Sequence, residues 1–297
     1  MARMIRVMSI SHKTGGDGRV LKLLRTHLHP GLDLVLLPET CVGESAGPVS
    51  LDAEIVRQVR ALSKQYRVNL VFPLYTCGAH GERINSALVI NREGEIAGQY
   101  RKTYPYWSEF DLTPPCAVTP PGDCVVALDF GRLGLAVCFD ANFPAVWQRL
   151  ADEGAELVAW CSAYSAGSQL TAHALNHHYA IVTCTLVPDC AVIDIDGREV
   201  FYRAGGDVCV CENVLDLDRC IFHENYNDEK VVRLVAEHPA EVEIEKRLPR
   251  EQWFLLHSVR TESSARMLSR AYGMTELRDY KKQSRDQIDQ MRTGGSR

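Results

Sequence analysis

Hydrophobic and polar residues along this chain follow two different periods, which predict strands and helices in alternation. The run at 32–39, LDLVLLPE, is almost continuously apolar, as expected for a strand that is buried on both faces. The segment 18–29 instead repeats its apolar residues three and four positions apart, which is typical of an amphipathic helix. The same two patterns predict further strands at 4–10, 68–74, 125–128, 133–138, 156–160, 181–186 and 212–217, and further helices at 51–66, 146–151, 170–179 and 228–238.

Two hairpins complete the predicted elements. One spans 84–102 around a short turn at 92–94, and the other spans 190–203 around Asp196-Gly197, a strong turn signal. A set of strand, helix and further strands occurs twice along the chain. This doubling indicates two sheets packed against each other between helices.

The stretch 134–164 carries the first candidate for chemistry. Its pattern is strand, tight corner, helix, strand, and Cys138 stands at the carboxyl end of the first strand. Ligands of α/β sheets bind outside the carboxyl ends of the strands. A nearby helix N-terminus also favours a thiolate. Cys138 is therefore a candidate nucleophile, although a free cysteine in a chain with 11 of them is more often a small buried hydrophobe.

Two charged residues stand at comparable positions. Pro38 cannot donate a hydrogen bond to a sheet and so ends its strand, which leaves Glu39 at the carboxyl end. Lys102 closes the second arm of the first hairpin. The loop at 103–123 that follows is rich in proline and aromatic residues, as expected for a pocket wall. Four aromatic residues are candidates to line that pocket: Tyr104, Tyr106, Trp107 and Tyr164.

Composition limits the possible function classes. The chain has 297 residues, of which 46% are hydrophobic and 24% charged, and its formal net charge is −5, so no basic face indicates nucleic-acid binding. No apolar run approaches the roughly 18 residues of a membrane helix, and the first residues do not resemble a signal peptide. An odd number of cysteines without a Cys-x-x-Cys pair indicates a reducing compartment, so we expect a cytoplasmic protein.

The cysteines do not show the spacing of a zinc site. Cys209 and Cys211 form a single Cys-x-Cys pair, which we interpret as residues on alternate faces of a strand rather than as metal ligands. We therefore expect neither a metal nor another cofactor.

Three segments taken in order resemble the nitrilase, or carbon–nitrogen hydrolase, superfamily. They are LVLLPET around Glu39, INSALVINREGEIAGQYRK up to Lys102, and GLAVCFDANFPAVW around Cys138. The segments GAELVAWCSAY and HYAIVTC fit later strands of that family. The resemblance covers residues 5–217 and implies a four-layer α-β-β-α sandwich with a catalytic Glu, Lys and Cys at these positions. A second glutamate of the family corresponds to Glu109.

The surroundings of Cys138 are most similar to the aliphatic-amidase branch. Asn142 fits that branch, whereas Phe139 and Ala141 depart from it. The chain lacks the Cys-Trp-Glu run of true nitrilases. It also lacks the arginines that follow the cysteine in carbamoyl hydrolases. These features predict neutral amides as substrates.

The chemistry can also be argued from the residues. A thiol needs an adjacent base near pH 7, and we expect Glu39 to take the proton of Cys138. Lys102 and the backbone N–H of Phe139 would stabilise the oxyanion, while Glu109 fixes Lys102 or the substrate amide. The predicted function is a thiol hydrolase that converts a small amide into a carboxylic acid and ammonia through a Cys138 thioester.

Three other interpretations stay open at this point. The first is a nitrile or N-carbamoyl hydrolase of the same superfamily. The second is a Cys–His hydrolase that uses His173, His177 or His178 of the HALNHHY segment. The third is a binding or assembly subunit that has the fold without the activity.

The C-terminal segment differs from the rest. We expect a hydrolase domain at 1–257 and a charged extension at 258–297, which has too few apolar residues to form a core of its own. Its Met267, Leu268, Tyr272 and Leu277 lie at near-helical spacing and could cover a narrow stripe. In the resembled family, tails cross to a neighbouring subunit. We therefore expect a homodimer or larger homo-oligomer in which residues after about Ser258 contact the partner chain.

Overall fold

The computed structural model describes residues 2–43 and 47–294, and its chain divides into two compact units. The larger unit is Ile5–Leu215, and the smaller contains the chain from Asp216 onward together with the first residues. Each unit has its own sheet system and is described separately.

The first sheet of the larger unit contains the N-terminal strands. Its order is β12-β1-β2-β3-β4-β5, in which β1, β2 and β3 are parallel and β3, β4 and β5 are antiparallel neighbours. The hairpin predicted at 84–102 is formed by β4 and β5. The strands are β1 (Met4–His12), β2 (Leu34–Leu36), β3 (Asn69–Cys77), β4 (Arg83–Ile90), β5 (Ile96–Arg101) and β12 (Val208–Asp216).

The second sheet has the order β11-β10-β9-β8-β7-β6, with a parallel centre of β7, β8 and β9. Its strands are almost completely buried in the centre, which explains their continuous apolar sequences. The strands are β6 (Val125–Leu128), β7 (Gly131–Val137), β8 (Leu157–Ser162), β9 (Ala180–Thr185), β10 (Asp189–Ile193) and β11 (Glu199–Ala204).

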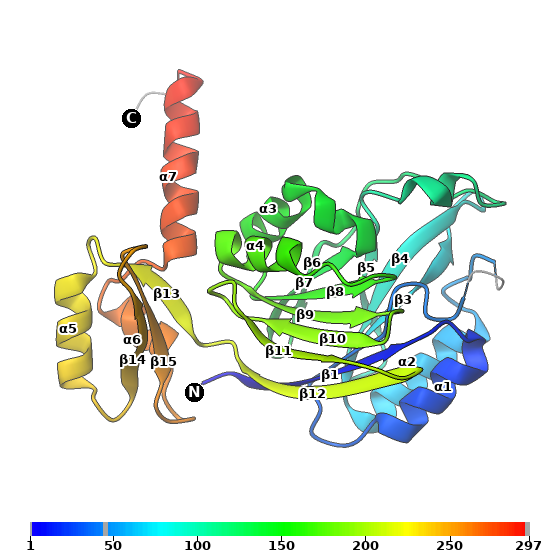
Figure 1. Ribbon diagram of the computed structural model, residues 1–297, viewed down its shortest axis with the longest axis horizontal. Coiled ribbons are helices and arrows are strands. Elements are labelled where there is room, and N and C mark those ends of the chain that lie inside the picture. Colours follow the sequence, from blue (N-terminus) through cyan, green and yellow to red (C-terminus); the bar gives the residue numbers. More distant parts are fainter. Residues whose placement is uncertain (1, 44–46, 295–297) are drawn as a thin grey trace. The chain divides into compact units, whose positions relative to one another are not determined.

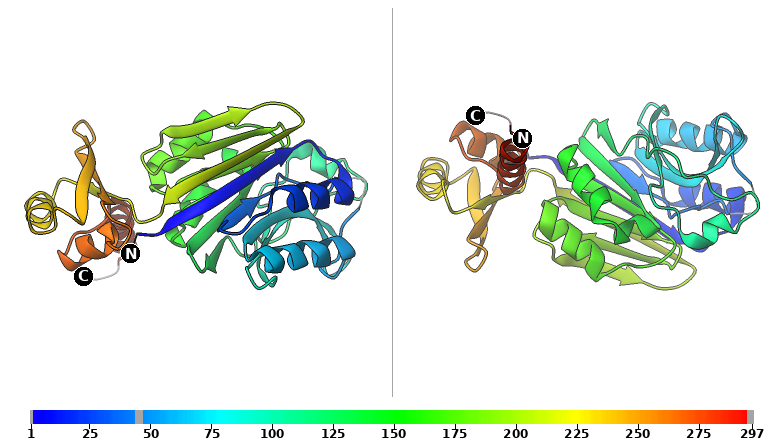
Figure 2. Two further views of the ribbon diagram at one scale, coloured as in Figure 1. Left: turned by 90° about the horizontal axis from the view of Figure 1, so that it is seen from below. Right: turned by 90° about the horizontal axis from the view of Figure 1, so that it is seen from above.

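The two sheets lie face to face, and helices cover their outer sides. Side chains of one sheet reach the backbone of the other: Ser9 Oγ donates to Thr183 O at 2.8 Å and Cys184 Sγ to Leu36 O at 3.3 Å. Figures 1 and 2 show one pair of helices over the first sheet and another pair over the second. The four-layer α-β-β-α prediction is therefore confirmed. The helices are α1 (Gly16–His27) and α2 (Glu54–Tyr66) on one side, and α3 (Pro144–Asp152) and α4 (Ser168–His177) on the other.

The direction of the strands places two chain segments at one edge of the first sheet. β5 runs parallel to β3 and β2 because two antiparallel pairings separate it from β3. Glu39 follows β2 and Lys102 follows β5, so both residues leave the first sheet at the same edge. This is the strand-end geometry from which the sequence predicted a site.

The interpretation of Cys209 and Cys211 as residues on alternate faces is wrong. Residues two apart on a strand point to the same face. Both side chains are buried on the same side of β12, and their sulfur atoms lie 3.7 Å apart.

The smaller unit is a three-stranded antiparallel sheet with helices, and the sequence predicted only its first helix. Its order is β13-β15-β14, and Phe222, Leu234, Phe254 and Ala265 contribute to its core. The elements are β13 (Cys220–His223), α5 (Asp228–Glu237), β14 (Val242–Leu248), β15 (Trp253–Ser258), α6 (Ala265–Ala271) and α7 (Leu277–Arg292).

The predicted extension 258–297 lies within this smaller unit, apart from residues 295–297, which fall outside the described residues. Ala265 and Met274 are buried in the same core as β13 and β15. The extension therefore shares a core with the strands before it. The division into a domain at 1–257 and an extension at 258–297 stays a prediction.

Across the described parts of the chain, no helix has both the length and the apolar character that crossing a membrane requires.

Candidate active site

Lys102 lies between two buried carboxylates. Its Nζ is 2.8 Å from Glu39 Oε1 and 2.6 Å from Glu109 Oε2. All three side chains are almost completely buried, although they come from the end of β2, the end of β5 and the short 3-10 helix η2 (Trp107–Phe110). The structure thus brings together three residues that the sequence singled out, and Glu39 and Lys102 among them are 63 positions apart.

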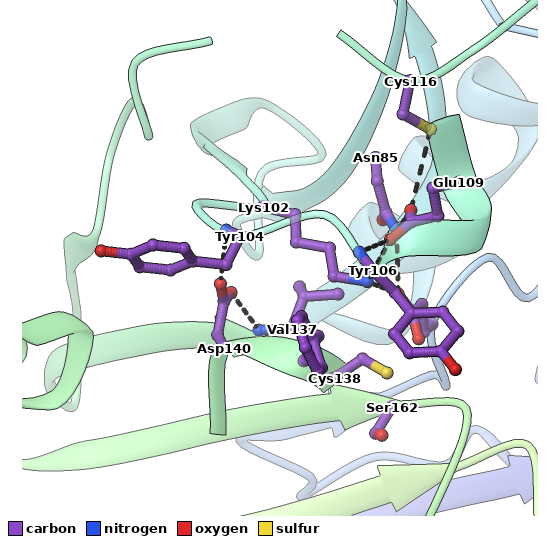
Figure 3. A network of polar contacts seen from close by, with 12 residues as sticks. Asn85, Lys102, Tyr104, Tyr106, Glu109, Cys116, Val137, Cys138, Asp140 and Ser162 are labelled. Carbon is purple, nitrogen blue, oxygen red and sulfur yellow. Dashed lines mark hydrogen bonds and ion pairs between the residues drawn. The ribbon is translucent and has the colours of Figure 1, made fainter. Parts of the chain in front are cut away.

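Glu109 is held by contacts on both oxygens. Besides Lys102, its Oε2 accepts the backbone N–H of Tyr106 at 2.5 Å, and its Oε1 accepts the Cys116 thiol at 3.7 Å. Figure 3 shows the Lys102 side chain extending towards Glu109, with the sulfur of Cys138 beside this group. Because its acceptor positions are filled, Glu109 is suited to positioning Lys102.

Asn85 connects the two carboxylates, and the sequence analysis did not single it out. Its Nδ2 donates to Glu39 Oε1 and to Glu109 Oε1, both at 2.8 Å. It lies on β4 in the apolar run INSALVI and is buried. A single amide side chain in a buried strand needs polar partners, so its position in an apolar run could have indicated that Asn85 contacts other polar residues.

Cys138 begins the 3-10 helix η3 (Cys138–Asn142) directly after β7 and has a left-handed backbone with φ of 48°. A non-glycine residue in this region is strained, and such strain is concentrated at functional sites. The side chain is buried, and the Glu39 carboxylate lies close enough to affect its pKa. Burial and the neighbouring Glu39 charge raise the pKa of the Cys138 thiol to about 12, against the opposing effect of Lys102. The resting nucleophile is therefore a protonated thiol.

The ammonium form of Lys102 is stabilised by its neighbours. Burial alone would lower the pKa of Lys102, but Glu39, Cys138 and Glu109 outweigh that effect and raise it. A permanent positive charge next to the thiol is what a developing oxyanion requires.

The turn that carries Cys138 is fixed by Asp140. Its carboxylate accepts the N–H of Val137 at 3.0 Å, the N–H of Tyr104 at 2.9 Å and the hydroxyl of Tyr100 at 2.7 Å. Complete burial raises the pKa of Asp140 to about 6, although these three donors act in the opposite direction. The same side chain therefore ties the nucleophile turn to the loop that follows Lys102.

The remaining predicted site residues lie around this turn. Phe139 packs edge-on against Tyr106, and the Tyr104 ring stacks on Phe143 at 3.7 Å between centroids. Tyr164 packs edge-on against Trp160, whose indole N–H donates to the Cys138 carbonyl at 3.3 Å. Trp107, by contrast, is 62% exposed, so it covers the surface of η2.

Asn142 belongs to an exposed chain of polar contacts. Its Nδ2 donates to Phe139 O at 3.1 Å, and its Oδ1 accepts Gln169 Nε2 at 2.7 Å. Gln169 in turn accepts the Tyr164 hydroxyl at 3.4 Å. These contacts connect α4 with the nucleophile turn.

The histidines considered for a Cys–His pair contact other groups. His173 stacks on Trp147 at 4.3 Å and contacts Ala141 O through its Nε2 at 2.8 Å. The Nδ1 of His178 lies 3.3 Å from Ile195 O, and the His177 ring stacks on Tyr179. The charged groups that affect the pKa of the Cys138 thiol are Glu39 and Lys102 and include no histidine, which disfavours the histidine interpretation.

Comparison with known families decides the identity of the larger unit. Residues 8–203 match the carbon-nitrogen hydrolase family. The chain belongs to this family. The matched range contains Glu39, Lys102, Glu109 and Cys138, the four residues that the resemblance pointed to.

Individual relatives are more distant. A formamidase of Pseudomonas syringae pv. syringae is 31% identical over 160 residues, which cover 50% of this chain and 44% of the formamidase. The chain thus spans about half the length of the curated relatives that it matches.

Solved structures of the superfamily share the fold. Saccharomyces cerevisiae Nit3, a member of branch 10 of the nitrilase superfamily, superimposes with a TM-score of 0.61 at 17% identity over 72% of this chain and 90% of Nit3. A carbon-nitrogen hydrolase from Helicobacter pylori gives a TM-score of 0.60 at 22% identity, with the same coverage. The hydrolase therefore has the nitrilase-superfamily fold.

Proposed function

We propose that this carbon-nitrogen hydrolase cleaves small neutral amides into a carboxylic acid and ammonia through a thioester on Cys138. The observation that carries the proposal is the Lys102 ammonium, held 2.8 Å from Glu39 and 2.6 Å from Glu109 with the Cys138 thiol beside this group (Figure 3). This set supplies a nucleophile, a base and a positive charge in one buried site.

The first half of the reaction forms the thioester. As the sulfur attacks the amide carbon, Glu39 takes the thiol proton, which a thiol with a pKa of about 12 does not release by itself. The Lys102 ammonium and the Phe139 N–H stabilise the oxyanion. Glu39 then gives its proton to the leaving nitrogen, and ammonia departs.

The second half regenerates the enzyme. Glu39 takes a proton from water, the hydroxide attacks the thioester carbon, and the carboxylic acid leaves as the sulfur regains its proton. Loss of one oxyanion donor commonly costs about 3 to 4 kcal/mol of transition-state stabilisation. Lys102 keeps its position and charge throughout, because Glu109 contacts its ammonium and Asn85 holds both carboxylates in place.

Two observations support amides over the other substrates of the superfamily. Several of the matching relatives are formamidases, of which this chain covers about half the length. The segment after Cys138, FDANFPAVW, contains no arginine that could bind the carboxylate of an N-carbamoyl amino acid. We also propose that the protein is cytoplasmic and acts as a homo-oligomer.

An ammonia-release screen tests the substrate class. The full chain is assayed with formamide, short aliphatic amides, ω-amides, N-carbamoyl amino acids and nitriles. We expect turnover with short neutral amides. Turnover confined to N-carbamoyl compounds or nitriles would refute the amide assignment, and failure of every class would favour the inactive binding subunit.

A further inference from the structure

Three cysteines form a cluster away from the Cys138 site. Cys190 lies on β10, and Cys209 and Cys211 lie on β12, so the cluster joins the two sheets of the larger unit. Their sulfur atoms all lie within 4.8 Å of one another, and all three residues are buried. In the second sheet, β9 and β8 separate β10 from β7, which places the cluster about 14 Å from the nucleophile strand at ordinary strand spacing.

The spacing of the sulfurs is that of metal ligands. Three sulfurs that each lie about 2.3 Å from one ion are about 4 Å apart when the ion is in their plane. The Cys209 and Cys211 sulfurs are 3.7 Å apart, and the Cys190 sulfur lies within 4.8 Å of both. Small side-chain movements would therefore place all three at bonding distance from a common centre.

The surroundings favour one class of ion. Among residues 2–43 and 47–294, no fourth ligand atom from a His, Cys, Asp or Glu lies within 4.8 Å of all three sulfurs. Structural zinc sites use four ligands, whereas a soft monovalent ion is satisfied by thiolates alone. The partly buried Phe201 packs on the cluster, and Cys190 Sγ also contacts the Ser11 hydroxyl at 3.4 Å.

We propose that Cys190, Cys209 and Cys211 form a three-sulfur site for a soft, thiophilic metal ion, with Cu(I) as its fitting occupant. Binding breaks the S–H bond of each coordinating thiol, releases its proton to solvent and forms a sulfur–copper bond. No electron is transferred, because copper stays in the +1 state. The bound ion would cross-link β10 to β12 and so stabilise the packing of the two sheets.

The test is an anaerobic titration of the fully reduced full-length chain with Cu(I) supplied as a complex with a colorimetric chelator. The Cys138→Ala background removes the active-site thiol, so that copper held there is not counted. In this background, Cys209→Ala and Cys211→Ala each remove one proposed ligand. Cys220→Ala is the matched control, because Cys220 is equally buried but belongs to the core of the smaller unit.

We expect one Cu(I) per chain to be kept against the chelator in the background and in the Cys220 control. The Cys209 and Cys211 variants should lose about 100-fold or more in affinity, and the melting temperature should rise with Cu(I) only where all three ligands are present. Absence of stoichiometric binding, or equal binding by the Cys209 variant, would overturn the proposal.

Copper-edge X-ray absorption on the Cys138→Ala chain provides a measurement that does not depend on the folding of the ligand variants. Three sulfur neighbours per copper would support the site. Two sulfur neighbours, or a shell of nitrogen and oxygen, would contradict it.

Discussion

Glu39 and Glu109 both contact Lys102, but their other partners assign them different tasks. Glu39 faces the Cys138 thiol, whereas Glu109 fills its acceptor positions with Tyr106 N–H and Cys116. An oxygen that is already occupied by backbone and side-chain donors is poorly placed to move protons. This difference separates a base from a positioning residue.

Replacing the two glutamates should therefore give different results. Glu39→Gln removes the base and should lower kcat/KM by about 10²- to 10⁴-fold. It should also abolish rapid alkylation of Cys138 by iodoacetamide near pH 7. Glu109→Gln should lower turnover less and leave part of the alkylation. Equal losses of alkylation in both variants would contradict the division of tasks.

The raised pKa of the Cys138 thiol predicts how its reactivity depends on pH. The folded chain keeps this proton up to about pH 12, whereas an unfolded chain releases it near pH 8.5. Glu39→Gln removes the neighbouring charge and so lowers this pKa, but burial, its largest cause, remains; alkylation of Cys138 in this variant, followed by peptide mass, should therefore reach its plateau well above pH 8.5. By the same linkage, the contribution of this thiol to stability falls as pH rises above about 8.5. A plateau near pH 8.5 would show an ordinary, solvated thiol.

At the scale of elements, the η3 turn depends on one carboxylate. Asp140 accepts three hydrogen bonds, and two of the donors are backbone N–H groups of Val137 and Tyr104. Asp140→Asn places an NH₂ group against donors, so at least one buried N–H loses its acceptor. Such a loss costs about 1 to 3 kcal/mol, and the displaced turn should reduce kcat.

Tyr100→Phe is the control for this prediction. It removes only the hydroxyl that Asp140 accepts at 2.7 Å and keeps both backbone contacts. We expect a cost of about 0.5 to 1.5 kcal/mol and most of the activity. Urea unfolding and steady-state rates check both variants. A larger activity loss in Tyr100→Phe than in Asp140→Asn would refute the role given to the carboxylate.

Much of the larger unit was predictable because its strands are short apolar runs with clear turn signals. The strand ends located Glu39, Lys102 and Cys138, since parallel strands direct their carboxyl ends to one edge. Asn85 was missed because its role depends on two carboxylates from distant segments. No local pattern reports such a contact.

The smaller unit was harder to predict for a different reason. In β14, whose sequence is VEIEKRL, exposed charged residues alternate with buried or partly buried residues. The strand therefore has few apolar residues by which its sequence could be recognised as a strand. Its antiparallel pairing with β15 cannot be predicted from the periodicity of the β14 sequence. The interpretation of Cys209 and Cys211 failed on the strand period itself, because residues two apart share a face.

At the scale of the whole molecule, α7 is the part of the predicted extension that can act between chains. Leu277 is buried, whereas Tyr280, Ile288 and Met291 are exposed and lie near one side of the helix. Ala265 and Met274, which precede α7, belong to the core and cannot be removed without damage. A truncation should therefore begin after Leu277.

Deleting residues 278–297 should convert the expected homodimer or larger oligomer into smaller species. Light scattering of the full and truncated chains gives the mass, and a thermal melt verifies that the truncated chain is folded. An unchanged mass with an unchanged melting temperature would mean that α7 has no part in assembly.

The claim on which the whole account depends is that Cys138 is the nucleophile, and the turnover of Cys138→Ala tests it most directly. Cys220→Ala serves as the matched control, because it removes the same atom from a buried cysteine in the other unit. With the best amide from the screen, we predict a loss of at least about 10⁴-fold in kcat for Cys138→Ala at an unchanged melting temperature. The control should keep the activity of the unsubstituted chain. Retention of more than a few per cent of activity by a folded Cys138→Ala would contradict the account.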